Sequence, residues 1–380
     1  MIVGALATTV LLSGCSASGP ASSDAGSDSP AVTVSTGSVP RVVDGWPTAA
    51  PAKLGFRPQR LAAMARDAKR KDSTCFAVVR KGKLAGDWNW GTPRLQPREV
   101  FSVTKSVTST LVGIAVRDGS LALDDRVSTY VPAWRGTESR AVTVRNLLSN
   151  DSGRFWSVDS DYVKLLQAAD RSTYAVRLGQ QYAPGTTWAY NNAAIQVLDR
   201  VIAKATGMTT ADFAAERLFT PLGMTHTRMT PDTSGRSTNA FFGLQTTCLD
   251  LARFARLYLE RGKVGPRRIL AAGYVKAATG RSSTKLNAAY GYLWWLNRYG
   301  ELRGATDQVD PAGQPVTEHQ GRLVPGAPVD LFSAIGLGGQ IAMVDPGSRT
   351  IVVRIGPAKA STAGAYTLRD AARAVTWALR

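Results

Sequence analysis

The chain has 380 residues, of which 44% are hydrophobic and 19% charged, a composition typical of a globular protein with a large buried core. Lys and Arg number 46 against 28 Asp and Glu, which gives a net charge of +18. The basic residues are scattered, and no zinc-finger or RNA-binding aromatic signature accompanies them. We therefore expect no nucleic-acid partner, because charge alone reports on association rather than on fold.

The amino-terminal segment has the pattern of an export signal. Residues 1–14 are apolar and uncharged, and they are followed by Cys15, so that they resemble the lipobox of bacterial lipoproteins. The apolar run is shorter than the ~20 residues that a membrane-spanning helix needs. We expect a signal peptide at 1–14, acylation of Cys15 and an extracytoplasmic protein anchored to the membrane, with secretion as the alternative. The positive charge then suits anionic lipid head groups or wall polymers.

A linker and two further cysteines follow. Residues 15–45 are rich in Ser, Ala, Gly, Pro and Asp, so they are predicted to form a flexible tether before a domain at 46–380. Cys75 and Cys248 either form one disulfide or lie buried as two thiols. An oxidising compartment favours the disulfide, although the spacing of the two residues does not decide.

The first elements of the domain are a helix and a hairpin. Residues 58–69 have helical periodicity, and residues 75–80 and 84–90 alternate around the turn at 81–83. Mostly helical segments follow, broken by loops that contain Pro and Gly.

The C-terminal part has the same elements in reverse order. Strands are expected at 339–344 and 350–355 around a turn at 345–348, and an amphipathic helix is expected at 368–379. These patterns predict an α/β (α+β) fold. The two ends of the domain would share an antiparallel sheet covered by the terminal helices, with an all-helical subdomain inserted at about 120–285.

Two common kinds of hydrolytic site are poorly supported. The chain has two histidines, His226 and His319, and it lacks a Gly-x-Ser-x-Gly motif, which argues against a Ser-His-Asp triad. It also lacks His-Glu-x-x-His and paired Cys-x-x-Cys motifs, so a zinc site is unexpected. We predict no metal or other cofactor.

The first candidate catalytic motif is the Ser-x-x-Lys sequence at 102–105, where a predicted helix begins. Residues three apart on a helix share one face, so the Lys105 amine can reach the Ser102 hydroxyl. Lysine serves as a base only when neutral, which requires burial or a nearby positive charge. The alternative is an ordinary helix start with an exposed lysine. A second Ser-x-x-Lys at 282–285, in a polar loop, shows how easily the pattern arises.

Two later motifs offer the other groups that acyl transfer needs. Tyr190 could pass a proton to a leaving group, and Asn192 could orient Lys105 and a substrate carbonyl. The alternatives are a packed tyrosine and a helix cap. In the glycine-rich stretch 336–339, the Leu337 N–H could face the Ser102 N–H across an oxyanion hole, unless the glycines only form a bulge.

Together these motifs resemble those of the serine β-lactamase/penicillin-binding-protein superfamily, in particular class C β-lactamase-like esterases and 6-aminohexanoate-oligomer hydrolases. The resemblance spans about 45–380. It implies an α/β sandwich with a helical insert, in which Ser102 is acylated, Lys105 and Tyr190 handle protons and Asn192 orients. Leu337 would line the oxyanion hole. Supporting stretches lie at 142–148, 218–224, 243–254 and 290–295.

The third motif departs from the pattern of penicillin-recognising members, which carry Lys-Thr-Gly or His-x-Gly. The stretch 331–336 offers no cation, and His319 lies before the expected strand. We therefore expect a serine hydrolase acting on an uncharged small-molecule ester or amide. The alternatives are a D-amino-acid-specific peptidase or β-lactamase near the cell wall, and a catalytically idle protein that binds wall peptides.

Overall fold

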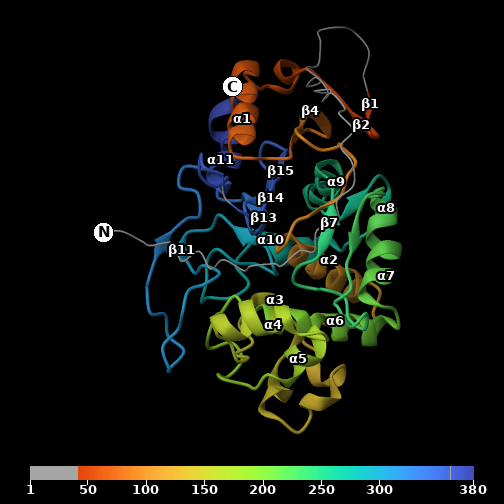
Figure 1. The fold of residues 1–380 in the computed structure, drawn as a ribbon, viewed down its shortest axis with the longest axis vertical. Coiled ribbons are helices and arrows are strands. Elements are labelled where there is room, and N and C mark those ends of the chain that lie inside the picture. Colours follow the sequence, from red (N-terminus) through yellow and green to blue (C-terminus); the bar gives the residue numbers. More distant parts are fainter. Residues whose placement is uncertain (1–41, 360) are drawn as a thin grey trace, which may run out of the picture. The chain divides into compact units, whose positions relative to one another are not determined.

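A computed structural model describes residues 42–359 and 361–380 (Figure 1). The predicted signal peptide, Cys15 and most of the predicted tether lie outside the described residues. In the part of the chain that is described, no helix is long and apolar enough to cross a membrane.

The core of the domain is a six-stranded antiparallel sheet to which both ends of the described chain contribute (Figure 1). Its strands, in spatial order, are β10 (Trp295–Leu296), β13 (Phe332–Gly336), β14 (Gln340–Asp345), β15 (Thr350–Ile355), β3 (Cys75–Arg80) and β4 (Lys83–Asn89). Side chains of a strand point alternately to its two faces. In β3, Phe76 and Val78 accordingly enter one hydrophobic core, and Ala77 and Val79 enter the other.

The terminal helices cover one face of this sheet, as the sequence predicted. Leu61 and Met64 of α1 (Pro58–Arg70) belong to the same core as Phe76. The C-terminal helix, expected at 368–379, is α11 (Leu368–Arg373) continued by the π-helical turn η7 (Ala374–Ala378). Figure 1 shows α1 and α11 near the strands β14 and β15.

Two long helices lie on the opposite side. The helix α9 (Cys248–Leu259) packs on β3, β14 and β15, and α2 (Val103–Arg117) packs on β13. The helix α2 is almost entirely buried, which explains its run of apolar and small polar residues without a charged face.

Helices dominate the predicted insert, but short strands also occur in it. The α-helices are α3 (Val144–Ser149), α4 (Leu165–Gln167), α5 (Arg171–Arg177), α6 (Asn192–Thr206), α7 (Thr210–Ala214), α8 (Thr220–Leu222) and α10 (Ala272–Thr279). The strands are β6 (Arg228–Met229), β7 (Leu244–Thr246), β8 (Lys263–Val264) and β9 (Arg267–Arg268). Since α9 also lies in this stretch, part of it belongs to the sheet layer.

Smaller ribbons complete the fold. They are β5 (Arg98–Glu99), which pairs with β7, the pair β11 (Gly300–Glu301) and β12 (Gln320–Gly321), and the pair β1 (Val42–Val43) and β2 (Trp46–Pro47). Residues 42–45, which the sequence assigned to the tether, therefore form β1 and its turn. An ion pair of 2.9 Å between Asp44 Oδ2 and Arg253 Nη1 holds this turn on the domain.

A disulfide joins the sheet to α9. Cys75 begins β3 and Cys248 begins α9, and their sulfur atoms are bonded at 2.03 Å across a sequence separation of 173 residues. Of the two alternatives that the sequence left open, the structure therefore has the disulfide.

Candidate active site

Ser102 lies at the N-terminus of α2, where its side chain does not cap the helix. The backbone before it is strained, because Phe101 has φ 48°, a value that a bulky residue rarely adopts. The Thr104 hydroxyl donates to the Phe101 carbonyl at 2.6 Å and accepts from the Leu244 N–H at 3.0 Å, which holds this turn. Ser102 is partly exposed, whereas Val103 is buried, so the serine hydroxyl stands at the edge of the core.

Lys105 is buried one helical turn further along. Its side chain is 1% exposed, and its Nζ donates to Ser102 Oγ at 2.7 Å and to the Phe241 carbonyl at 2.9 Å. Burial lowers the pKa of Lys105 to about 7, while the charge of Asp161 opposes this shift. A substantial fraction of neutral amine is therefore present near pH 7, as a general base requires. The prediction that Ser102 and Lys105 meet on one helix face is confirmed by this distance.

Tyr190 lies directly over the lysine. Lys105 Nζ is 4.7 Å from the centroid of the Tyr190 ring, and the phenol is 4% exposed. Burial raises the pKa of Tyr190 above its usual range, and its hydrogen bond with the Ser102 side chain opposes this. Tyr190 is thus held protonated near pH 7. The predicted serine, lysine and tyrosine consequently form one cluster.

Aromatic rings pack against Tyr190 in this cluster. Tyr190 stacks on Trp295 with a centroid distance of 5.7 Å and meets Tyr290 edge to face at 6.1 Å. Trp295 is half-buried and pairs with Ser333 of β13 in the sheet. Tyr190 is therefore held between aromatic side chains.

Asp161 is a buried carboxylate that acts on the charge of Lys105, and sequence reasoning missed it. It is 1% exposed and lies in the π-helical turn η5 (Ser160–Lys164), within a stretch that the sequence analysis left without an assigned element. Its carboxylate accepts the backbone N–H groups of Asn192 at 2.7 Å and Ala193 at 2.9 Å, which begin α6. Burial raises the pKa of Asp161 to about 6, against the effect of these hydrogen bonds and of Lys105. No motif marks this residue, although π-helical turns often occur at functional sites.

Asn192 occupies the first position of α6, two residues after Tyr190, and is 4% exposed. Asn191, not Asn192, provides the side-chain cap of the helix, because its Oδ1 accepts the Ala194 N–H at 2.7 Å. The side chain of Asn192 is thus not used as a helix cap. Its predicted role in orienting Lys105 and a substrate carbonyl stays a prediction.

The carbonyl of Phe241, which the sequence did not indicate, holds Lys105 from a second direction. The neighbouring Ala240 is fixed by the Gln196 side chain, which accepts its N–H at 2.9 Å, and by Thr108, which donates to its carbonyl at 2.7 Å. The position of the Lys105 amine therefore depends on residues from α2, α6 and the segment before β7.

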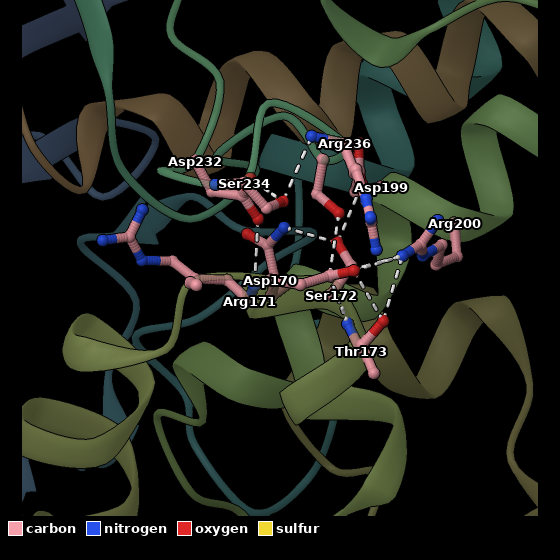
Figure 2. Close-up of polar contacts among 12 residues, drawn as sticks. Asp170, Arg171, Ser172, Thr173, Asp199, Arg200, Asp232, Ser234 and Arg236 are labelled. Atoms are coloured by element: carbon pink, nitrogen blue, oxygen red, sulfur yellow. Dashed lines mark hydrogen bonds and ion pairs between the residues drawn. The ribbon is translucent and has the colours of Figure 1, made fainter.

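A polar network fixes the segment that leads to this carbonyl (Figure 2). Asp170 pairs with Arg200 at 3.2 Å, and Asp232 accepts the Arg171 N–H at 2.9 Å. The Arg171 side chain also donates to Asn239 at 2.9 Å. These contacts join α5 and α6 to the segment 232–239, two residues before Phe241.

Two glycines of the third motif lie in close contact with backbone carbonyl groups of other segments of the chain. A Cβ on Gly336 would lie 2.2 Å from the Val100 carbonyl oxygen, and a Cβ on Gly339 would lie 2.2 Å from the Tyr366 carbonyl oxygen. Gly336 thus allows β13 to approach the segment before Ser102. Leu337 follows in the turn to β14 and is 63% exposed, and its predicted place in an oxyanion hole stays a prediction.

The other candidate groups lie elsewhere. Lys285 is exposed in a loop, and the Ser282 hydroxyl donates to the Ala288 carbonyl, so the second Ser-x-x-Lys is not a site of the same kind. His319 is exposed beside β12, in a ribbon separate from the main sheet. Among the residues that the structure describes, no group of three His, Cys, Asp or Glu could hold a metal ion.

Comparisons with known proteins indicate the family to which the chain belongs. The model of the family Beta-lactamase matches residues 59–373. Penicillin-binding protein 4 of Amycolatopsis lactamdurans is 30% identical over 191 residues, which cover 42% of this chain and 50% of that protein. The chain thus spans about half the length of the first curated relatives that it matches.

Solved structures show the same fold at low identity. A Bacillus anthracis protein described as a 6-aminohexanoate-dimer hydrolase has a TM-score of 0.65 and 17% identity, covering 82% of this chain and 80% of that one. A family VIII carboxylesterase has a TM-score of 0.61 and 18% identity, covering 86% and 99%. Because the family model covers most of the sequence, and the predicted antiparallel sheet with terminal helices is present, this chain belongs to the β-lactamase family.

Proposed function

We propose that this protein is a serine hydrolase that cleaves ester or amide bonds through an acyl-Ser102 intermediate. The observation that carries the proposal is the 2.7 Å contact between Ser102 Oγ and the Nζ of a buried lysine whose pKa burial lowers to about 7. Family membership and the resemblance to esterases support it.

The proposed reaction uses each group of the cluster. Neutral Lys105 accepts the Ser102 proton while Oγ attacks the substrate carbonyl carbon, and the backbone N–H of Ser102 stabilises the oxyanion. The tetrahedral intermediate expels the alcohol or amine, which takes a proton from the Lys105 ammonium through Tyr190. Water then attacks the acyl-serine ester, gives its proton to the same pair, and releases the acid as Ser102 regains its proton.

The surroundings favour an uncharged acyl group. The strand β13 carries no cationic side chain, and Trp295 on the neighbouring β10 presents an aromatic surface beside Tyr190. A carboxylate on the substrate would find no partner on this strand.

A fluorophosphonate probe tests the proposal directly. We expect it to label the protein once, on the peptide that contains Ser102, because among the described residues this is the serine that has a buried lysine base at 2.7 Å. Ser282→Ala is the matched control and should be labelled like the wild type. Labelling that persists in Ser102→Ala would refute the assignment.

A D-amino-acid-specific peptidase or a β-lactamase is the second candidate. It is favoured by the relatives, which include D-aminopeptidase of Cereibacter sphaeroides, 26% identical over 172 residues, and penicillin-binding protein 4. A fluorescent penicillin distinguishes the two: stable labelling or turnover supports the second candidate, and neither is expected for an ester hydrolase without the third-motif cation.

We also propose that the protein is exported and anchored to the membrane through Cys15. The bonded pair Cys75–Cys248 supports export, because disulfides persist in oxidising compartments. Cys15→Ala should move the protein from the membrane to the soluble fraction of cells lysed in high salt. A variant that stays in the membrane fraction would contradict the anchor.

A further inference from the structure

Two turns of the central sheet lie at the end opposite the candidate active site. Gly336, which contacts the segment before Ser102, pairs with Gln340 at one end. At the other end Thr350 pairs with Arg80, so the turn between β3 and β4 lies beside the turn between β14 and β15. A hydrogen bond of 2.9 Å from the Lys81 N–H to the Arg349 carbonyl joins the two turns.

Exposed basic side chains gather on these turns and on the adjoining end of α9. A Cβ on Gly82 would lie 3.6 Å from Arg256 Nη2, and Arg349 Nη2 contacts Glu260 Oε1 at 2.5 Å. The ribbon of β8 and β9 follows α9 directly. We call the exposed cations of these segments the basic face: Lys81, Lys83, Arg256, Arg261, Lys263, Arg267, Arg268 and Arg349.

Carboxylates leave most of this charge unbalanced. Within the described chain, Glu260 is the acidic residue of these segments whose side chain reaches the surface. Its carboxylate forms ion pairs with Arg349 at 2.5 Å and with Arg256 at 4.0 Å. Asp345, in the turn after β14, is 1% exposed and accepts the Ser348 N–H at 3.1 Å. The basic face therefore carries a large net positive charge.

The first described residues of the chain, in β1 and β2, also lie at this face. Asp44, in the turn between β1 and β2, pairs with Arg253 of α9. A cavity of about 380 Å³ is lined by Gly45 and Trp46 on one side and by Arg256 and Lys263 on the other. Cys15 lies 27 positions before Val42 in the sequence, so the predicted tether joins the domain beside the basic face.

We propose that the basic face binds the surface of an anionic phospholipid bilayer and turns the candidate active site away from the membrane. Each lysine or arginine held near an anionic bilayer adds to the attraction, and the attraction is lost beyond a Debye length. The eight side chains come from the two turns, the end of α9 and the ribbon of β8 and β9. These segments carry no exposed aromatic ring of the kind that stacks nucleic-acid bases. Binding by this face requires neither the chemistry of Ser102 nor acylation of Cys15.

Vesicle sedimentation with the full chain carrying Cys15→Ala, so that no lipid can be attached, tests this proposal. We expect binding to phosphatidylglycerol vesicles and not to phosphatidylcholine vesicles, with a loss of at least about tenfold between 0.05 and 0.5 M salt. The variant Lys81→Gln/Lys83→Gln/Lys263→Gln/Arg267→Gln should bind at least about 100-fold more weakly. Ser102→Ala should bind normally.

The matched control removes the same charge from the helical insert. Arg140→Gln/Arg177→Gln/Lys204→Gln/Arg236→Gln changes four exposed cations away from the basic face and should lose much less affinity. Equal losses in the two quadruple variants would mean that net charge, not this face, drives binding, and would overturn the proposal. Equal binding to both kinds of vesicle, or binding to duplex DNA in place of vesicles, would overturn it as well.

Discussion

The amine of Lys105 decides what the candidate site can do. A lysine with 1% exposure would be costly to keep charged, so burial lowers its pKa to about 7 and makes it a usable base. The Phe241 carbonyl and the Ser102 hydroxyl fix its position, and the Tyr190 ring covers it.

This pKa predicts the pH dependence of the reaction. Activity should rise with pH through about 7, as Lys105 loses its proton, and kcat/KM measured from pH 5 to 9 should show this limb. A rate that is flat over this range would contradict a lysine base.

The same pKa has an effect on stability with a definite sign. Unfolded Lys105 has a pKa near 10, so between about pH 7 and 10 the unfolded state binds more protons than the folded state, and stability rises with pH. The free energy of unfolding of the wild type, relative to Lys105→Met, should therefore increase by on the order of 1 kcal/mol per pH unit in this window. Denaturant titrations at pH 7 and 9.5 measure it, and a constant difference would disprove the low pKa.

We expect Asp161 to raise the pKa of Lys105. Asp161→Asn removes a charge that raises the pKa of Lys105, so the acid limb of the rate profile should move to lower pH. The rate should also fall, because an amide does not accept both N–H groups of α6 as a carboxylate does. Asp159→Asn is the control, since Asp159 is exposed and pairs with Lys164 in the same segment. Identical profiles for the two variants would contradict this role.

At the scale of elements, the sequence predicted the regular parts closely. The helix expected at 58–69 is α1 (Pro58–Arg70), and the strands expected at 75–80 and 350–355 have those bounds. The helical pattern of α1 is strong because this helix presents one face to a core. The strands β3 and β15 are short apolar runs because both of their faces are buried. The position of Asp161 could not be predicted, because the bonds that place it join residues about 30 apart and leave no periodic pattern.

The close contact between Gly336 of β13 and Val100, which lies just before Ser102, gives a test at the scale of elements. Gly336→Ala places a Cβ 2.2 Å from the Val100 carbonyl oxygen, so it should destabilise the protein by about 1–3 kcal/mol and lower activity through displacement of Ser102. Gly136→Ala has open space around its Cβ and should change stability by less than about 0.5 kcal/mol. Equal unfolding free energies for these two variants would show that the contact is unimportant.

At the scale of the whole molecule, one covalent bond links the sheet to α9 across 173 residues. A cross-link that closes a loop of this length restricts the unfolded chain, so Cys75→Ala/Cys248→Ala should lose about 2–5 kcal/mol of stability. Thiol reductant should lower the melting temperature of the wild type toward that of the variant and leave the variant unchanged. If reductant leaves the melting temperature of the wild type unchanged, and that temperature equals that of the variant, the disulfide has no stabilising role.

The central claim concerns Ser102, and the most direct test is hydrolysis of p-nitrophenyl butyrate by the wild type, Ser102→Ala and Ser282→Ala. We predict that Ser102→Ala loses at least about a thousandfold in kcat. Ser282→Ala should keep the wild-type rate, because the Ser282 hydroxyl donates to the Ala288 carbonyl. Equal rates in the wild type and Ser102→Ala would contradict the account.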